Sequence, residues 1–152
     1  MKDDRLRSPV KTEYVKALGL AAYAFASCEW QVAWSCERIR PGSLAKVTRE
    51  ELTAGRIAKL FIDLCRNIPK SKERSELQSI AQEFARLVLV RNDILHGKPC
   101  TAPSGEQRLS GQKIIEIPDL QNASDDFVAC GGRLNNLYYK FLLHYVPASS
   151  GA

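Results

Sequence analysis

The chain has 152 residues, of which 45% are hydrophobic and 26% charged, with a formal net charge of +5. These values exclude a disordered chain and predict a single globular domain over residues 1–152, with its core from about 12 to 146. The positive charge is compatible with an anionic partner such as RNA. The five cysteines are widely spaced and form no C-x-x-C motif. We therefore expect reduced thiols in a cytoplasmic protein, with no metal site and no cofactor.

The first predicted helix extends from about Thr12 to Arg38. Its apolar stripe alternates steps of three and four residues, the spacing of a helix in an antiparallel bundle. The stripe comprises Val15, Leu18, Ala22, Phe25, Glu29, Val32, Cys36 and Ile39. Glu29 is its one charged member. Trp30 and Trp34 lie on a flanking face, where they would extend the core or join a subunit contact.

The segment Ala17–Cys36 is apolar enough to raise two other interpretations. A secretory signal would have a short basic start, but acidic residues at positions 3, 4 and 13 precede the segment. A membrane span would place Glu29 and Gln31 in the bilayer, which is costly. We therefore expect neither secretion nor membrane association.

Two further helices are predicted in the middle of the chain. Pro41-Gly42-Ser43 marks a turn, and Thr48-Arg49-Glu50-Glu51 reads as a capping box that begins a helix ending near Asn67. Pro69-Lys70-Ser71 leads into a third helix that runs to His96. The stripe of this third helix comprises Leu77, Ile80, Phe84, Leu87 and Ile94.

The pattern changes after residue 96. The segment from Gly97 to Pro118 is predicted to be an irregular excursion. Residues 98–105 have the composition of a loop, and residues 108–117 would form either a small hairpin or an ordered excursion. A fourth helix then begins at Pro118, is capped by Asp119 or Asn122, and carries its apolar stripe to Tyr145.

A glycine pair interrupts the predicted fourth helix. Gly131 and Gly132 each cost roughly 1 kcal/mol relative to alanine, which indicates either close helix packing or a kink. Four amphipathic helices with two short connections predict an all-α fold. We expect an antiparallel four-helix bundle with the excursion between the third and fourth helices.

Two charged residues lie on apolar stripes, Glu29 on the first helix and Arg91 on the third. A buried charge without a partner is costly, so the two residues are natural partners if their helices are neighbours. One interpretation is a structural ion pair that fixes helix register. The other is a functional site, because an arginine is also a fixed cation for a phosphate.

The end of the third helix favours the functional interpretation. Asn92 and His96 are four residues apart and share a face beside Arg91. Because histidine moves protons near neutral pH, the set suits metal-independent RNA cleavage by the ribose 2′-OH. That reaction uses a base and an acid, and the only other histidine, His144, is interpreted as a helix-terminal residue. A symmetric dimer would supply a second His96.

The sequence Arg91-Asn92-Asp93-Ile94-Leu95-His96 matches the R-x4-6-H motif, with a polar residue after the arginine. In its helical pattern from about Thr12 to Val146, with Glu29-Trp30 in the first helix, the chain resembles the HEPN superfamily. The resemblance implies an all-α domain that dimerises, with both motifs lining a ribonuclease cleft. It implies catalytic roles for Arg91 and His96 and supporting roles for Asn92 and Glu29. Many such proteins are toxins of toxin–antitoxin or phage-defence systems, so a cognate antitoxin is an implied partner.

One position departs from part of this family. Some HEPN toxins carry a tyrosine two residues after the histidine, which a nucleotidyltransferase antitoxin modifies, whereas this chain has Lys98. The resemblance therefore does not support that mode of regulation. Lys98, Arg108 and Lys113 are instead the basic surface residues predicted to bind RNA.

The predicted function is thus a metal-independent endoribonuclease that acts as a homodimer on RNA. The alternative is a non-catalytic helical module that binds a nucleic acid or a protein. In that case Glu29 and Arg91 are structural and His96 is only a helix-terminal residue. An exposed surface around Trp30 or Trp34 that reaches beyond the dimer contact would favour this alternative.

Overall fold

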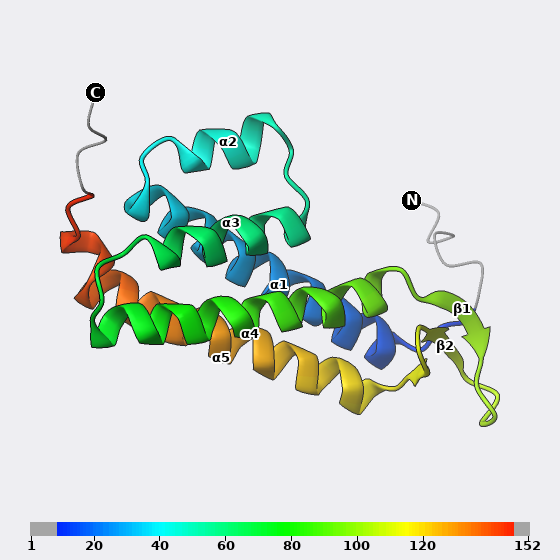
Figure 1. The fold of residues 1–152 in the computed structure, drawn as a ribbon. Coiled ribbons are helices and arrows are strands. Elements are labelled where there is room, and N and C mark those ends of the chain that lie inside the picture. Colours follow the sequence, from blue (N-terminus) through cyan, green and yellow to red (C-terminus); the bar gives the residue numbers. More distant parts are fainter. Residues whose placement is uncertain (1–8, 148–152) are drawn as a thin grey trace, which may run out of the picture.

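The computed structural model describes residues 9–147 and is mostly helical (Figure 1). Within this range it contains five α-helices, one short 3-10 helix and a three-stranded sheet. The α-helices are α1 (Thr12–Ile39), α2 (Ser43–Arg49), α3 (Ala54–Arg66), α4 (Lys72–Leu95) and α5 (Ile117–Lys140). The 3-10 helix η1 is Leu142–His144, and the strands are β1 (Lys98–Thr101), β2 (Gln107–Ser110) and β3 (Ile114–Ile115). None of the described helices is both long and apolar enough to cross a bilayer.

The core lies between the four long helices. Helix α1 packs against α3 and α5, and α4 packs against the same two helices. Phe25 connects α1 to both α4 and α5, because its ring stacks on Phe84 of α4 and meets Phe127 of α5 edge to face. The predicted stripe of α4 is confirmed by the burial of Leu77, Ile80, Phe84, Leu87 and Ile94.

The directions of the helices differ from the predicted antiparallel order. At the start of α1 the Tyr14 hydroxyl donates to the Ile115 carbonyl, just before α5. Near the end of α1, Arg38 donates to the Leu142 carbonyl, just after α5. Helices α1 and α5 therefore run parallel. Because α2 carries the chain back, α3 also runs in the direction of α1, and α4 alone runs against its neighbours (Figure 1).

This difference arises from α2, which the sequence analysis missed. The predicted capping box at Thr48 is wrong, because Thr48 lies inside α2 and its hydroxyl donates to the Leu44 carbonyl. The helix that follows is capped by Thr53, whose side chain accepts the Arg56 N–H. The turn predicted around Gly42 is present, and its φ of 93° is one that glycine adopts without strain. It leads, however, into a separate short helix.

The excursion between α4 and α5 forms the small sheet. Strands β2 and β3 make the predicted hairpin, with Leu109 opposite Ile115. The loop expected from residue 98 onward begins instead with strand β1, which pairs antiparallel with β2. Pro99 is tolerated there because β1 is an edge strand. The Tyr14 hydroxyl accepts the Leu109 N–H and so holds the sheet against the start of α1.

Helix α5 begins and ends earlier than predicted. Glu116 is its N-cap, and Asp119 completes a capping box by accepting the Glu116 N–H. The helix ends at Lys140, so Tyr145 lies beyond it, after η1.

The two adjacent glycines in α5, Gly131 and Gly132, have different surroundings. The helix continues through both residues. At Gly131 a Cβ would lie 2.7 Å from the Oε1 atom of Gln31, so close packing against α1 explains this glycine. Gly132 faces open space, and nothing in the structure explains it.

Candidate functional site

The motif at the end of α4 lies beyond the cover of α3. Gly55, in the first turn of α3, lines a surface groove together with Val88 and Leu89 of α4. Helix α3 therefore begins beside these residues, and the last turn and a half of α4 extends past it (Figure 1). Arg91, on this uncovered part, approaches α1 where Phe25 and Glu29 lie.

Arg91 is half-buried and only partly satisfied. Its guanidinium carbon lies 5.4 Å from the centroid of the Phe25 ring, within the range of a cation–π contact. Its Nη1 donates to the Oδ1 atom of Asn92 at 2.9 Å. Its Nε is buried and has no hydrogen-bond partner among the described residues. The guanidinium is thus held in place but keeps its charge available.

Glu29 lies near Arg91 without pairing with it. Burial raises the pKa of the Glu29 carboxyl, and the positive charge of Arg91 opposes that rise. Within residues 9–147, no oxygen of Glu29 lies within the 4.0 Å of an ion pair with Arg91. The structure therefore brings the two predicted partners into the same neighbourhood, and their direct contact is not formed.

His96 is exposed and is the C-cap of α4. Its backbone N–H donates to the Asn92 carbonyl at 2.9 Å, which closes the last turn. The side chain of Asn92 is turned toward Arg91, whereas the imidazole of His96 is free to meet a ligand in solvent. The motif therefore presents a guanidinium, an amide and an imidazole along one and a half turns of helix.

Asp93 fixes the sheet to the end of α4, a role that the sequence analysis missed. Its Oδ1 accepts the Gln112 N–H at 2.9 Å. A Cβ at Gly111 would lie 2.3 Å from the same oxygen, so this turn approaches the carboxylate as only glycine can. Gly97 is similarly confined, because its Cβ would lie 3.0 Å from the Leu109 Cβ. No local pattern in the sequence marks these contacts, which join residues far apart in the chain.

Arg108 is not the surface residue that was predicted to bind RNA. Its side chain is buried, donates to Glu116 at 2.7 Å and pairs also with Glu106. Its guanidinium carbon lies 4.9 Å from the centroid of the Tyr14 ring. The hydrogen bond to Glu116 raises the pKa of Arg108. Its charge is thus neutralised inside the sheet, and the correct role is structural.

The other basic residues of the prediction remain accessible. Lys98 is exposed on the edge strand β1, two residues after His96. Lys113 is exposed but donates to Asp119 at 2.7 Å. His144 follows α5 at the end of the molecule opposite His96, since α4 and α5 run in opposite directions. One chain therefore places a single histidine at the candidate site.

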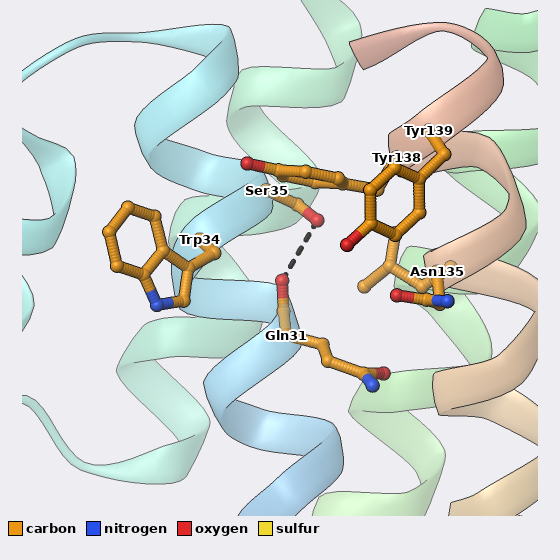
Figure 2. Close-up of a pocket in the computed structure, with 7 residues that line it drawn as sticks. Gln31, Trp34, Ser35, Asn135, Tyr138 and Tyr139 are labelled. Atoms are coloured by element: carbon orange, nitrogen blue, oxygen red, sulfur yellow. Dashed lines mark hydrogen bonds between the residues drawn. The ribbon is translucent and has the colours of Figure 1, made fainter. Parts of the chain in front are cut away.

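A second surface feature lies between α1 and α5, on another flank of α1. Figure 2 shows Gln31 and Ser35 of α1 on the side toward Asn135, Tyr138 and Tyr139 of α5, with the indole of Trp34 turned away from them. All six residues line a hollow of about 210 Å³. The Ser35 hydroxyl donates to the Gln31 carbonyl at 2.8 Å. The Oε1 atom of Gln31 is buried without a hydrogen-bond partner among the described residues. The spacing of Trp30 and Trp34 predicted that they share one flank of α1, but no pattern in the sequence marks the hollow.

No protein-family model, curated protein or solved structure matches this chain.

Proposed function

We propose that the protein is a metal-independent endoribonuclease of HEPN type, in which Arg91 and His96 carry the reaction. The observation that supports it best is the end of α4, where the half-buried Arg91 guanidinium forms no ion pair among the described residues and His96 is open to solvent. In this proposal the four long helices form a HEPN-like bundle, with α2 as an additional helix. Membership of a toxin–antitoxin or phage-defence system, with a cytoplasmic site of action, belongs to the same proposal.

The reaction is a transesterification within the RNA. One imidazole takes the proton of the ribose 2′-OH, whose oxygen then forms a bond to the adjacent phosphorus. The bond from phosphorus to the 5′-oxygen breaks, and an acid gives that oxygen a proton. Arg91 stabilises the added negative charge on the phosphate oxygens. The products carry a 2′,3′-cyclic phosphate and a 5′-hydroxyl.

The reaction needs two proton-transfer groups, and one chain holds one histidine near Arg91. A homodimer that presents two copies of the motif to one RNA would supply the second imidazole. Asn92 supports the reaction by holding Arg91 at Nη1. Glu29, next to the guanidinium, supports it by balancing its charge.

The test is an RNA-cleavage assay in the presence of EDTA. We expect the wild-type protein to cleave RNA to cyclic-phosphate ends. His96→Ala and Arg91→Ala should each lower the rate by about 100-fold or more, since general acid–base catalysis and charge stabilisation contribute on that scale. His144→Ala is the matched control, because it removes the histidine at the other end of the molecule and should leave cleavage unchanged.

Cleavage that survives in the His96 or Arg91 variant removes that residue from the mechanism. Cleavage that requires a divalent cation contradicts the metal-independent reaction. RNA binding without cleavage by the folded wild-type protein supports the second candidate, a non-catalytic binding module. The exposure of Trp30 and Trp34 is the observation that favours this second candidate.

A further inference from the structure

Two buried thiols face each other where α1 packs against α5. Cys28 of α1 and Cys130 of α5 are each 2% exposed, and neither has a role in the proposed reaction. The residues that join the two parallel helices are 101 positions apart in sequence at the start of α1 and 104 apart near its end. Cys28 and Cys130, which are 102 apart, fit this register. They therefore lie about one turn beyond the contacting rings of Phe25 and Phe127, along the same seam.

The two helices pack as closely at this point as a disulfide requires. A Cβ at Gly131 would lie 3.8 Å from the Cα atom of Cys28, so the α5 backbone next to Cys130 is in contact with α1. A disulfide needs Cα atoms roughly 4.4–6.8 Å apart, which is closer than the axes of most packed helices. The two thiols also share a hydrogen bond, which raises the pKa of Cys28 and lowers that of Cys130. Their sulfur atoms are therefore neighbours before any oxidation.

A hollow in the surface gives small molecules a route to this pair of thiols. The hollow has a volume of about 430 Å³, lies between α1 and α5, and has Cys28 in its lining. Gly131 and Gly132 form part of its wall, and as glycines they place no side chain in the way. A molecule as small as hydrogen peroxide can therefore approach the pair from solvent.

A second pair of cysteines provides an internal comparison. Cys36 of α1 and Cys65 of α3 are both 0% exposed, and burial is the main cause that raises the pKa of each thiol. Burial of this kind keeps a thiol protonated and unreactive. In the first pair, by contrast, the hydrogen bond from Cys28 favours the thiolate of Cys130. We therefore expect Cys36 and Cys65 to stay reduced where Cys28 and Cys130 react.

We propose that Cys28 and Cys130 are an oxidation site for peroxides, and that their oxidation closes a disulfide between α1 and α5. In a reducing compartment the two thiols remain reduced, so the disulfide forms only when a peroxide reaches them. The proposal concerns residues outside the candidate site, and it does not depend on the proposed ribonuclease function.

The chemistry has two steps. The thiolate of Cys130 attacks one oxygen of hydrogen peroxide, so an S–O bond forms, the O–O bond breaks, and the leaving hydroxide takes a proton to become water. The sulfur of Cys28 then loses its proton and attacks the sulfenic acid on Cys130. The S–S bond forms, the S–O bond breaks, and a second water leaves. The two sulfur atoms together give up two electrons, and the peroxide is reduced to two waters.

The disulfide would hold α1 in place beside the candidate site. Cys28 lies between Phe25 and Glu29, the two residues of α1 that lie next to Arg91. The bond would close a loop of more than 100 residues, and cross-links that close long loops restrict the unfolded chain most strongly. Oxidation should therefore stabilise the fold and bind α1 to α5 at the level of Arg91.

The first test identifies the cysteines that react. Cys100 is the one cysteine that is not buried, so Cys100→Ser provides the background, with four thiols left. The protein is treated with hydrogen peroxide, unfolded in the presence of an alkylating reagent, and digested for mass spectrometry. We expect Cys36 and Cys65 to be alkylated and the peptides of Cys28 and Cys130 to be joined by a disulfide. Without peroxide, all four cysteines should be alkylated.

The second test measures thermal unfolding of the same protein. Peroxide should raise the unfolding temperature by about 5–10 °C, and dithiothreitol should reverse the rise. Cys28→Ala in the Cys100→Ser background should abolish the shift. Cys65→Ala is the matched control, because it removes a buried thiol of α3 and should leave the shift intact. Circular dichroism of each variant verifies that the fold is retained.

Three results would overturn the inference. They are alkylation of all four cysteines after peroxide treatment, oxidation of Cys36 and Cys65 to the same extent as Cys28 and Cys130, and a disulfide that leaves the unfolding temperature unchanged. The first test needs no substitution in the core, so its outcome stands even if Cys28→Ala fails to fold. A reduced protein that does not cleave RNA would contradict the proposed function alone and would leave the oxidation site unaffected.

Discussion

Arg91 and Arg108 have opposite settings, although both stand over an aromatic ring. Arg108 forms ion pairs with Glu106 and Glu116, and these contacts stabilise the small sheet. Arg91 contacts Phe25 and Asn92, and it has no carboxylate within ion-pair distance among the described residues. A phosphate approaching the end of α4 therefore meets a guanidinium that forms no direct ion pair with a described carboxylate, although Glu29 lies nearby.

This contrast predicts opposite effects for a matched pair of substitutions. Arg108→Gln should lower the temperature of unfolding by roughly 2–4 °C, because it leaves Glu106 and Glu116 without their partner. It should leave RNA affinity unchanged. Arg91→Gln should weaken RNA binding and change the unfolding temperature less. Thermal unfolding and an RNA-binding titration on the same samples measure both effects, and a loss of RNA binding in the Arg108 variant would contradict the assignment.

The raised pKa of Glu29 predicts that the stability of the fold depends on pH. Its pKa in the folded protein is raised by burial, so the folded state binds its proton more tightly than the unfolded chain. This contribution to the free energy of unfolding is complete below the ordinary pKa of 4.5 and is lost as the pH rises through the raised value. Glu29→Gln should therefore remove a fall in stability above pH 4.5, seen as a flatter pH profile in urea unfolding.

Glu37 provides a control, because its pKa is shifted in the opposite direction to that of Glu29. The N–H groups of Leu44 and Gly42 donate to its carboxylate and lower its pKa. Its contribution is present above the ordinary pKa and is lost as the pH falls through the lowered value. Glu37→Gln should thus reduce stability at neutral pH. Equal pH profiles for wild type and Glu29→Gln would show that Glu29 is not perturbed by its surroundings.

At the scale of elements, the glycine pair in α5 tests how closely α1 and α5 pack. Gly131→Ala would bring its Cβ to 2.7 Å from Oε1 at the end of the flexible Gln31 side chain, so Gln31 must turn aside and we expect little or no gain in the free energy of unfolding. Gly132→Ala meets nothing and improves helix propensity, so we expect a gain of about 0.5–1 kcal/mol. Denaturant unfolding of the two variants decides, and equal effects would contradict the close approach at Gly131.

Sequence periodicity predicted the elements that are long enough to show it. The stripe of α4 repeats over five apolar residues, and all five are buried. Helix α2 has seven residues, too few to display a repeat, so its Thr48 was assigned to the start of the next helix. Strand β1 depends on pairing with residues 107–110, and its own composition, with Pro99, indicates a loop.

The candidate site was predictable in part for the same reason. The placing of Arg91 and His96 at the end of a helix follows from local spacing and is confirmed. The position of Phe25 beneath Arg91 and the clasp between Asp93 and Gly111 join residues from distant segments. Arg108 was assigned to the surface because its two carboxylate partners are neighbours only after the sheet has folded.

At the scale of the whole molecule, one short helix determines where the site is open. Because α2 returns the chain, α3 starts beside Val88 and Leu89 and leaves the end of α4 uncovered. The sheet supports that end from one side through Asp93, while α1 supports it through Phe25. Helix α1 thus carries part of the candidate site on one flank and the hollow beside Gln31 and Ser35 on another.

Because its end is uncovered, α4 should show unequal protection of its backbone amides from hydrogen exchange. Backbone amides between Ile80 and Leu87 lie in a helix packed on both sides, and they should exchange with deuterium only when the whole domain opens. Amides of residues 91–96 share the same helix but lack the cover of α3, so small local openings should release them many times faster. Native-state hydrogen exchange would show this as a break in protection within one continuous helix. The residues proposed to act on RNA would then lie in the part of α4 that opens most often. A bound phosphate should slow hydrogen exchange at residues 91–96 more than elsewhere in the helix.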